Sequence, residues 1–210
     1  MKIAVIGATG RTGRPLVAEL VRRGHTVTAL VRDPAKLDDL AQRVQIVTGD
    51  SRTQGDLDRL VTGVDAVVSA LGPTAKEASL HTETATALIE AMHAAGVRRF
   101  VGVSGAGIDV PGDEKSLSAK VISKAIQTLG GDVVKDKPAE YATYAASDLV
   151  WTLVRPPRLV DGEATGRLEH HAHRSTHSTK ITRTDLAAFV ADVVEQDLYP
   201  RQAPFVATAR

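Results

Sequence analysis

The chain opens with a short apolar strand that runs directly into three glycines. Residues 2–6 read Lys-Ile-Ala-Val-Ile, residues 7–13 read Gly-Ala-Thr-Gly-Arg-Thr-Gly, and a helical pattern follows over 14–23. In such a strand–turn–helix unit, Gly7 permits the tight turn, Gly10 lets backbone approach a pyrophosphate, and Gly13 lets the helix pack closely. Free amides and the positive end of the helix dipole then face an anion. The spacing therefore predicts a dinucleotide site in which Thr9 and Thr12 also take part, although a purely structural turn uses the same glycines.

Length and composition indicate one globular unit. The chain has 210 residues, a formal net charge of +1 and no cysteine. The balanced charge gives no reason to expect a nucleic-acid or anionic-membrane partner, and the lack of cysteine excludes disulfides and thiol chemistry. No window approaches the ~20 apolar residues of a membrane span. We therefore expect a cytoplasmic protein without a membrane or nucleic-acid partner.

Strand and helix patterns alternate along the chain. The predicted strands are 2–6, 25–31, 44–47, 65–69, 99–103 and 150–154. The predicted helices are 14–23, 34–42, 55–62, 78–95, 116–129, 138–147 and 182–195. Thr53, with Asp56, and Thr182 are the predicted helix caps. Apolar strands separated by helices predict one α/β domain over residues 1–210, a Rossmann-type, doubly wound, mainly parallel sheet. Residues 165–181 are expected to form a polar hairpin on the substrate side, and 205–207 an edge strand.

The second strand ends in an arginine where many NAD-binding proteins have an acid. A carboxylate at this place, about 20 residues past the glycines, would bind the ribose 2′-OH. Here Arg32 follows the strand, and Arg11 lies inside the glycine turn. Guanidinium groups suit a 2′-phosphate because they make bidentate bonds to it. We therefore expect NADP(H) to be preferred, with NAD(H) as the alternative because a one-residue register shift would place Asp33 there.

Two further strand ends are candidates for cofactor contacts, since ligands of open α/β sheets bind at that edge. Asp50 and Ser51 follow the third strand, where the carboxylate can accept from the adenine amino group; a simple turn is the alternative. Ala70, Leu71 and Gly72 follow the fourth strand, where a loop of small residues can pass under the nicotinamide ribose.

Several segments together resemble one known group of proteins. These segments are 7–13, 30–33, 49–50, 103–105, 151–157 and 181–187. In this order they resemble the atypical short-chain dehydrogenase/reductases, in particular the NmrA-like and biliverdin-IXβ reductase (flavin reductase) branch. The resemblance implies an NAD(P)-binding protein and places Pro156 at the cofactor. It implies less about the reaction, because the group includes reductases of flavins, tetrapyrroles and quinones as well as non-catalytic redox sensors.

The acid–base pair of ordinary short-chain dehydrogenases is missing. They use a tyrosine with a lysine four residues later, whereas Tyr141, Tyr144 and Tyr199 are followed at that spacing by alanine, aspartate and alanine. Aligned on Trp151, Lys137 falls at the family's lysine position and Val133 at its tyrosine position.

Other residues are then the candidates for catalysis. Ser104, at the end of the fifth strand, is expected to face the nicotinamide or the substrate, and Lys137 to bind the nicotinamide ribose. Arg158 takes a place where the flavin reductase branch commonly has histidine, and an arginine there suits an anionic substrate. A turn serine and a surface lysine are the alternatives.

Four histidines crowd the predicted hairpin, namely His170, His171, His173 and His177. In a strand, His171 and His173 would share a face, as zinc ligands do. Because only Glu169 is an obvious partner, we expect a polar surface and no metal site.

Three functions follow from these observations. The first is an NADPH-dependent reductase that transfers a hydride to a conjugated small-molecule acceptor, such as a flavin, quinone or linear tetrapyrrole. The second is a non-catalytic NADP(H)-binding redox sensor with a protein partner at the helix over 116–129, a segment that would act as a lid in the enzyme. The third is a nicotinamide-dependent isomerase or epimerase, which the missing tyrosine disfavours.

Overall fold

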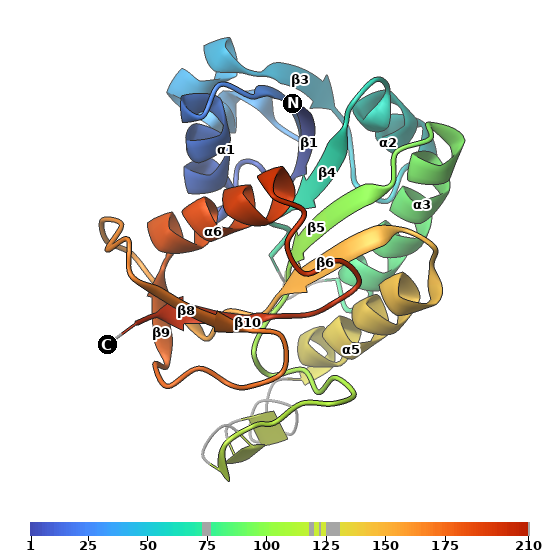
Figure 1. Ribbon diagram of the computed structural model, residues 1–210. Coiled ribbons are helices and arrows are strands. Elements are labelled where there is room, and N and C mark those ends of the chain that lie inside the picture. Colours follow the sequence, from blue (N-terminus) through green and yellow to red (C-terminus); the bar gives the residue numbers. More distant parts are fainter. Residues whose placement is uncertain (73–76, 118–119, 122, 125–130, 210) are drawn as a thin grey trace.

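A six-stranded parallel sheet forms the centre of the molecule (Figure 1). The computed structural model describes residues 1–72, 77–117, 120–121, 123–124 and 131–209, with the backbone alone for 131–135. The strands are β1 (Lys2–Ile6), β2 (Thr26–Val31), β3 (Gln45–Thr48), β4 (Ala66–Ser69), β5 (Arg99–Val103) and β6 (Val150–Val154). They lie in the order β3-β2-β1-β4-β5-β6, the order of doubly wound dinucleotide-binding sheets. All carboxyl ends therefore share one edge, as the sequence predicted.

Helices cover both faces of this sheet (Figure 1). One face packs against α1 (Gly13–Arg22), η1 (Pro34–Arg43) and α6 (Arg183–Glu195). The other packs against α2 (Gln54–Val61), α3 (Leu80–Ala94) and α5 (Gly131–Ala146). Side chains of β1 alternate between the two layers, with Ile3 and Val5 in one and Ala4 and Ile6 in the other. This two-sided burial explains why the strands are continuous apolar runs.

The predicted hairpin over 165–181 is wrong. The segment contributes β8 (Leu168–His171) and β9 (Lys180–Thr182), which do not pair with each other. Instead β8 pairs antiparallel with β10 (Phe205–Thr208), and β9 pairs parallel with β7 (Arg158–Val160). Because both partners are distant in sequence, the local turn pattern could not identify them.

Two helix starts differ from the prediction. Helix α5 begins at Gly131, so Pro138 lies inside it, where proline forgoes one backbone hydrogen bond. Thr53 precedes α2 without a side-chain cap, whereas Thr182 caps α6 by accepting from the Asp185 amide at 3.0 Å, as predicted. Of the predicted helix over 116–129, residues 117, 120–121 and 123–124 are helical, and 118–119, 122 and 125–129 lie outside the described residues. Among described residues, no helix is both long and apolar enough to cross a membrane.

Candidate functional site

The glycine turn joins β1 to α1 at the carboxyl edge of the sheet. Gly7 has a φ of +76°, and a Cβ there would lie 2.8 Å from the Ala70 carbonyl and the Leu71 nitrogen. A Cβ at Gly13 would lie 2.0 Å from the Gly7 oxygen. Gly13 thus lets the helix pack close to the turn, as predicted. Besides permitting the turn, Gly7 lets the backbone after β4, at Ala70 and Leu71, pack against it.

The amides that follow Gly10 are free. The Gly10 N–H donates to the Gly7 carbonyl at 3.0 Å. In the described part of the chain, the N–H groups of Arg11, Thr12 and Gly13 donate no hydrogen bond. The Thr12 side chain does not cap α1 either. Unsatisfied amides at a helix start favour an anion, so the turn fits a pyrophosphate.

A small cavity of about 90 Å³ lies beside this turn, between the ends of β1 and β2 and the β3–α2 connection. Its wall includes Gly7, Thr9, Arg32, Asp50, Ser51 and Leu71. The exposed Arg32 side chain makes no hydrogen bond or ion pair with any described residue. Asp33, the acid one position on, caps η1 by accepting from the Ala35 amide at 3.1 Å. The structure therefore leaves Arg32 on the wall of this cavity without a partner among the described residues, and engages Asp33 elsewhere.

Asp50 and Ser51 both lie on this wall but are already engaged. The Asp50 carboxylate accepts from the Arg52 amide and guanidinium at 3.0 Å, and the hydrogen bond from Arg52 lowers the pKa of Asp50, with a smaller contribution from Arg32. The Ser51 hydroxyl is buried and lies 2.9 Å from the Thr84 hydroxyl of α3. Ser51 therefore links the cavity wall to α3, and its predicted contact with a cofactor remains a prediction.

Arg11 is not brought to Arg32. Its guanidinium donates to Asp161 at 2.8 Å, and Arg183 donates to the same carboxylate at 2.6 Å. Arg11 is absent from the wall of the small cavity. The structure thus does not bring Arg11 and Arg32 together around one phosphate, because Arg11 pairs with Asp161, which follows β7.

Ser104 follows β5 at the same edge. Its backbone N–H donates to the Val154 carbonyl at 2.8 Å, which fixes it beside β6. The Ser104 hydroxyl oxygen is buried and has no hydrogen-bond partner among the described residues. Buried hydroxyls normally have a partner, but Ser104 lines neither cavity described here, so its contact with a nicotinamide or a substrate remains a prediction.

Lys137 lies in a buried polar cluster that the sequence did not predict. Its ammonium donates to His81 Nδ1 at 3.0 Å, to Glu140 at 2.9 Å and to the Val103 carbonyl at 3.4 Å. Burial and then the Lys137 charge lower the pKa of His81 to about 3, and burial raises the pKa of Glu140 in spite of Lys137. Asp136 accepts from the amides of His81 and Thr82 at the start of α3. Lys137 thus lies near the end of β5, and its contact with the nicotinamide ribose remains a prediction.

The tyrosines lie away from this edge. Tyr144 is buried, with its ring stacked on Phe100 at 4.2 Å, and burial raises its pKa well above the ordinary value. Tyr141 packs edge-on against Trp151. The Tyr199 hydroxyl lies 2.6 Å from His170 Nδ1, and burial raises the pKa of Tyr199. None of the three lines either cavity described here.

A much larger cavity, of about 1200 Å³, opens after β5 and β6. Gly105 and Ala106 from the loop after β5 line it, together with Pro156, Pro157 and Arg158 after β6 and residues 169–171 and 174–179. Pro156 also accepts from the Ala106 amide at 3.0 Å. Because the sheet is parallel, this cavity and the small one lie along the same edge, so a ligand bound over the glycine turn would extend toward it. Arg158 is exposed on its wall, as expected for a substrate contact.

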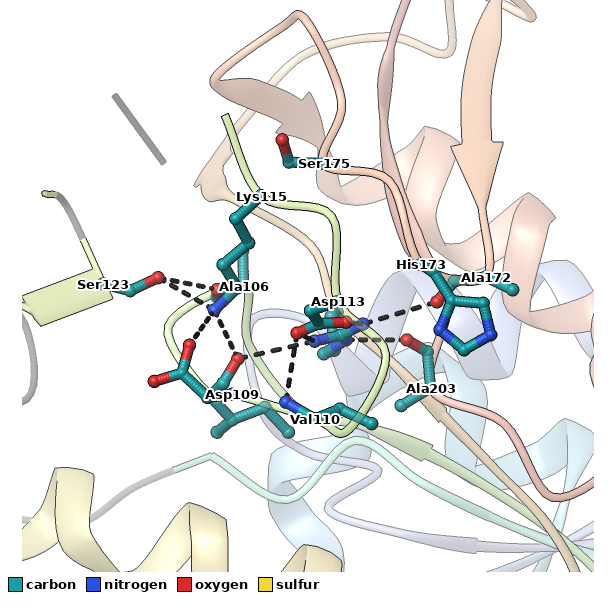
Figure 2. A network of polar contacts seen from close by, with 12 residues as sticks. Ala106, Asp109, Val110, Asp113, Lys115, Ser123, Ala172, His173, Ser175 and Ala203 are labelled. Carbon is teal, nitrogen blue, oxygen red and sulfur yellow. Dashed lines mark hydrogen bonds and ion pairs between the residues drawn. The ribbon is translucent and has the colours of Figure 1, made fainter. Parts of the chain in front are cut away.

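Buried charges fix the wall of the large cavity (Figure 2). The Arg155 side chain is fully buried and donates two bonds of 2.7 Å to Asp113. It also donates to the Ala203 carbonyl at 2.6 Å and lies 3.7 Å from the Phe205 ring centre. The Lys115 ammonium donates to Ile108, Asp109 and Ser123. The loop after β5 is therefore bonded to β6 and to the segment that leads into β10.

The four histidines do not share one strand face. Strand β8 ends at His171, so His173 lies beyond it. His177 Nδ1 lies 3.0 Å from Glu169, and His170 contacts Tyr199. Within the described residues, no three histidine or acidic side chains gather as metal ligands would. His170, His171 and His177 instead line the large cavity.

The sequence analysis missed His81, Asp113 and Lys115. His81 stood in a helix pattern, where its contact with Lys137, 56 residues on, gives no local signal. Asp113 and Lys115 stood in a loop of glycine and charged residues that was not interpreted. Only the position of Arg155, at a strand end and directly before Pro156, could have indicated a buried cation beside this loop.

Comparison with known proteins gives consistent matches. A family model described as NAD(P)H-binding matches residues 7–197. The chain is 32% identical over 197 residues to a ceramide reductase of Caulobacter vibrioides, covering 90% of this chain and 56% of that protein. It is 38% identical over 109 residues to the uncharacterized protein YwnB of Bacillus subtilis, covering 51% and 48%. The chain spans 36% to 48% of the length of the first three curated relatives.

Solved structures match over nearly the whole chain. A Burkholderia pseudomallei protein, provisionally described as exported, superimposes with a TM-score of 0.82 and 34% identity, covering 99% of each chain. A Streptococcus pneumoniae protein, provisionally described as an NADH-flavin reductase, gives a TM-score of 0.80 and 27% identity, covering all of both chains.

Proposed function

The chain belongs to the NAD(P)H-binding family that it matches, and on that premise we propose that it is an NADPH-dependent reductase of a conjugated acceptor. A flavin, a quinone or a linear tetrapyrrole is the acceptor class that fits. The proposal rests on one observation. The Ser104 hydroxyl is buried and has no partner among the described residues. It comes directly before Gly105 and Ala106, which line the cavity of about 1200 Å³ at the edge where a nicotinamide would end. The names of two relatives, an azoreductase and a flavin reductase, support reduction of conjugated acceptors.

The residues present fit the cofactor along the whole edge. The free amides of Arg11, Thr12 and Gly13 would bind the pyrophosphate. Leu71 and Gly72 would pass beneath the nicotinamide ribose, near Lys137, and Asp50 would accept from the adenine. When bound, the cofactor supplies the hydride. Ser104, Lys137 and Pro156 would position its reactive end toward the large cavity, and Arg158 would bind an acidic group of the acceptor.

Preference for the phosphorylated cofactor rests on Arg32. Its guanidinium has no partner in the described residues, and Asp33 is engaged as a cap. Replacing Arg32 with Ala should remove a charge-assisted contact of about 1.5–3 kcal/mol, which weakens NADPH binding roughly tenfold or more. NADH binding should be nearly unchanged. Calorimetric titration with both cofactors measures this, and equal losses for the two would contradict the assignment.

Arg11 supplies the matched control. Because it pairs with Asp161, Arg11→Ala should alter the ratio of the NADPH and NADH dissociation constants less than Arg32→Ala does. A larger change in that ratio for Arg11→Ala would move the 2′-phosphate site to the glycine turn.

Hydride transfer to a conjugated acceptor does not need a tyrosine acid. The product is a delocalised anion that water protonates, so positioning supplies most of the acceleration. Tyr141→Phe and Tyr144→Phe should therefore change turnover little once folding is confirmed. Ser104→Ala should lower turnover more, because a lost hydrogen bond misaligns the two reacting atoms.

The direct experiment measures NADPH oxidation with FMN, riboflavin, biliverdin and quinones. We expect at least one acceptor to be reduced faster than without enzyme, with stereospecific transfer of deuterium from labelled NADPH. If NADPH binds tightly while no acceptor is reduced, the enzyme proposal fails. The non-catalytic NADP(H) sensor would then replace it.

A further inference from the structure

His171 differs from the other histidines around the large cavity. It is the last residue of β8 and lines the cavity. Its Nδ1 accepts two backbone hydrogen bonds, from the His173 amide at 3.0 Å and the Arg174 amide at 2.9 Å. Pairing with Phe205 of β10 fixes the backbone beneath the ring. The ring is thus fixed at its backbone and at one nitrogen.

These two bonds determine the tautomer of the ring. A backbone N–H can only donate, so Nδ1 must present its lone pair and cannot carry a proton without losing both bonds. The neutral ring then has its proton on Nε2. Nε2 is not buried and has no partner among the described residues. His171 therefore presents an N–H donor on the cavity wall.

The neighbouring histidines lack this arrangement. The Nδ1 of His170 lies beside a tyrosine hydroxyl, which is compatible with either tautomer, and the Nδ1 of His177 donates to the Glu169 carboxylate. His173 Nδ1 is buried without a partner among the described residues. Among these histidines, His171 alone has a tautomer that backbone donors set within the described residues.

We propose that His171 is a neutral hydrogen-bond donor to the carbonyl oxygen of the acceptor, which makes a conjugated carbonyl compound the substrate class. This rests on the proposed reductase function. The acceptor gains a hydride, its π-electron pair moves onto the carbonyl oxygen, and water later protonates that oxygen. NADPH loses that hydride, which carries both electrons, and becomes NADP⁺. An N–H donor that is fixed before the reaction stabilises the negative charge as it develops on the carbonyl oxygen.

A neutral donor suits this task better than a charged one. A charged imidazolium would bind anions in the ground state as strongly as in the transition state, which does not accelerate the reaction. A fixed neutral N–H strengthens its bond only as negative charge forms, as in other enzymes that use neutral imidazole. His171 would thus stabilise the charge without transferring a proton, whereas the tyrosine of ordinary short-chain dehydrogenases donates one.

The tautomer is tested first, without any turnover. Nitrogen-15 spectra of the full chain, with His171→Gln used to assign the signal, should show a protonated Nε2 and a bare Nδ1 at neutral pH. In the complex with NADP⁺, which has no hydride to give, the quinone menadione should shift the Nε2–H signal. A protonated Nδ1, or no shift at saturating menadione, would overturn the proposal.

Turnover gives the second test. His171→Leu should lower the turnover number with menadione by about 100-fold, the effect of losing one such donor. It should leave the NADPH dissociation constant and the reduction of a carbonyl-free azo dye unchanged. His171→Gln, which keeps an N–H donor, should recover part of the loss. His93→Leu, a control at an exposed histidine that pairs with Asp148, should match the unmodified protein.

The outcomes separate this inference from the proposed function. If acceptors are reduced and His171→Leu is as fast as the unmodified protein, the role of His171 is refuted while the reductase stands. If no acceptor is reduced but menadione shifts the Nε2–H signal, the donor site is confirmed and the reductase function fails.

Discussion

Backbone atoms crowd the glycines of the cofactor turn, whereas charged side chains 42 residues apart fix the wall of the large cavity. At the turn, a Cβ on Gly13 would lie 2.0 Å from the Gly7 oxygen. At the cavity, Arg155 and Asp113 form a buried bidentate pair. The first kind of contact follows from seven consecutive residues, 7–13. The second depends on the loop after β5, on β6 and on the approach to β10 together.

This difference has a consequence for function. A turn defined by close backbone contacts admits few substitutions, which suits binding of an invariant pyrophosphate. A wall bonded through side chains changes shape when loops change, and loops on a rigid scaffold commonly carry specificity. Under the proposed function, the turn would bind the cofactor and the large cavity would select the acceptor, along one sheet edge.

The largest expected effect is at the buried ion pair. Arg155→Met should lower the free energy of unfolding by about 3–5 kcal/mol, because it leaves the Asp113 carboxylate buried without its partner. Urea titration followed by circular dichroism measures the change.

Two further variants test the cause of that loss. Arg155→Met with Asp113→Leu should regain part of it, because an apolar pair replaces the ion pair without an unpaired charge. Arg22→Met, which breaks the exposed pair with Glu19, should change little. A single Arg155→Met variant as stable as the unmodified protein would show that the wall does not depend on this pair.

A smaller effect is expected at the glycine turn. Gly13→Ala should destabilise the fold by about 1–3 kcal/mol, the usual range for overpacking, because the added carbon meets backbone that cannot rotate away. Cofactor affinity should fall with it. The matched control is Gly55→Ala in α2, where a Cβ meets nothing within 4 Å and alanine should stabilise by roughly 0.5–1 kcal/mol. Similar unfolding curves for both variants would contradict the close-contact account of Gly13.

The same contrast explains what the sequence could predict. The strands of the sheet, the glycine turn and the Thr182 cap follow from local patterns, and the structure has them all. Ser104 was also expected at this edge, because parallel strands bring their carboxyl ends together. These features depend on neighbours in sequence or on the sheet as a whole.

Other features depend on single long-range contacts. Arg11 donates to Asp161, which lies 150 residues further along the chain, and is not brought to Arg32. Strand β8 pairs with β10, and the local turn pattern, which predicted a hairpin, cannot identify that partner. The buried cluster of His81, Lys137 and Glu140 forms only when α3 and α5 pack together. No periodicity or spacing within either helix encodes such a contact.

The cluster of His81, Lys137 and Glu140 should make stability depend on pH. The pKa of His81 is about 3 in the folded state against 6.5 ordinarily. Between those values the unfolded chain takes up a proton that the folded chain does not, so stability is full above pH 6.5 and falls as the pH drops. From pH 8 to pH 5 the loss from this group is about 2 kcal/mol.

His81→Gln isolates this contribution. Glu140, whose pKa is raised by burial, acts in the opposite sense, since its protonation stabilises the folded state as the pH falls. Comparing unfolding free energies of the unmodified protein and His81→Gln at both pH values removes the terms that they share. Equal losses in the two proteins would show that His81 is not buried as a neutral group.

The smallest expected effect compares two threonines that precede helices, one on each side of the sheet. Thr182 caps α6 through its hydroxyl, so Thr182→Ala should cost about 1 kcal/mol of unfolding free energy. Thr53 makes no such bond, because the Asp56 amide donates to the Thr53 carbonyl at 3.0 Å, while the Asp56 carboxylate accepts from the Asp50 amide at 2.8 Å. Thr53→Ala should therefore change stability by much less. Thermal unfolding of the two variants side by side measures the difference. Equal losses would mean that Thr53 caps α2 in solution, and that the local pattern at this turn prevails over the competing contact with Asp50.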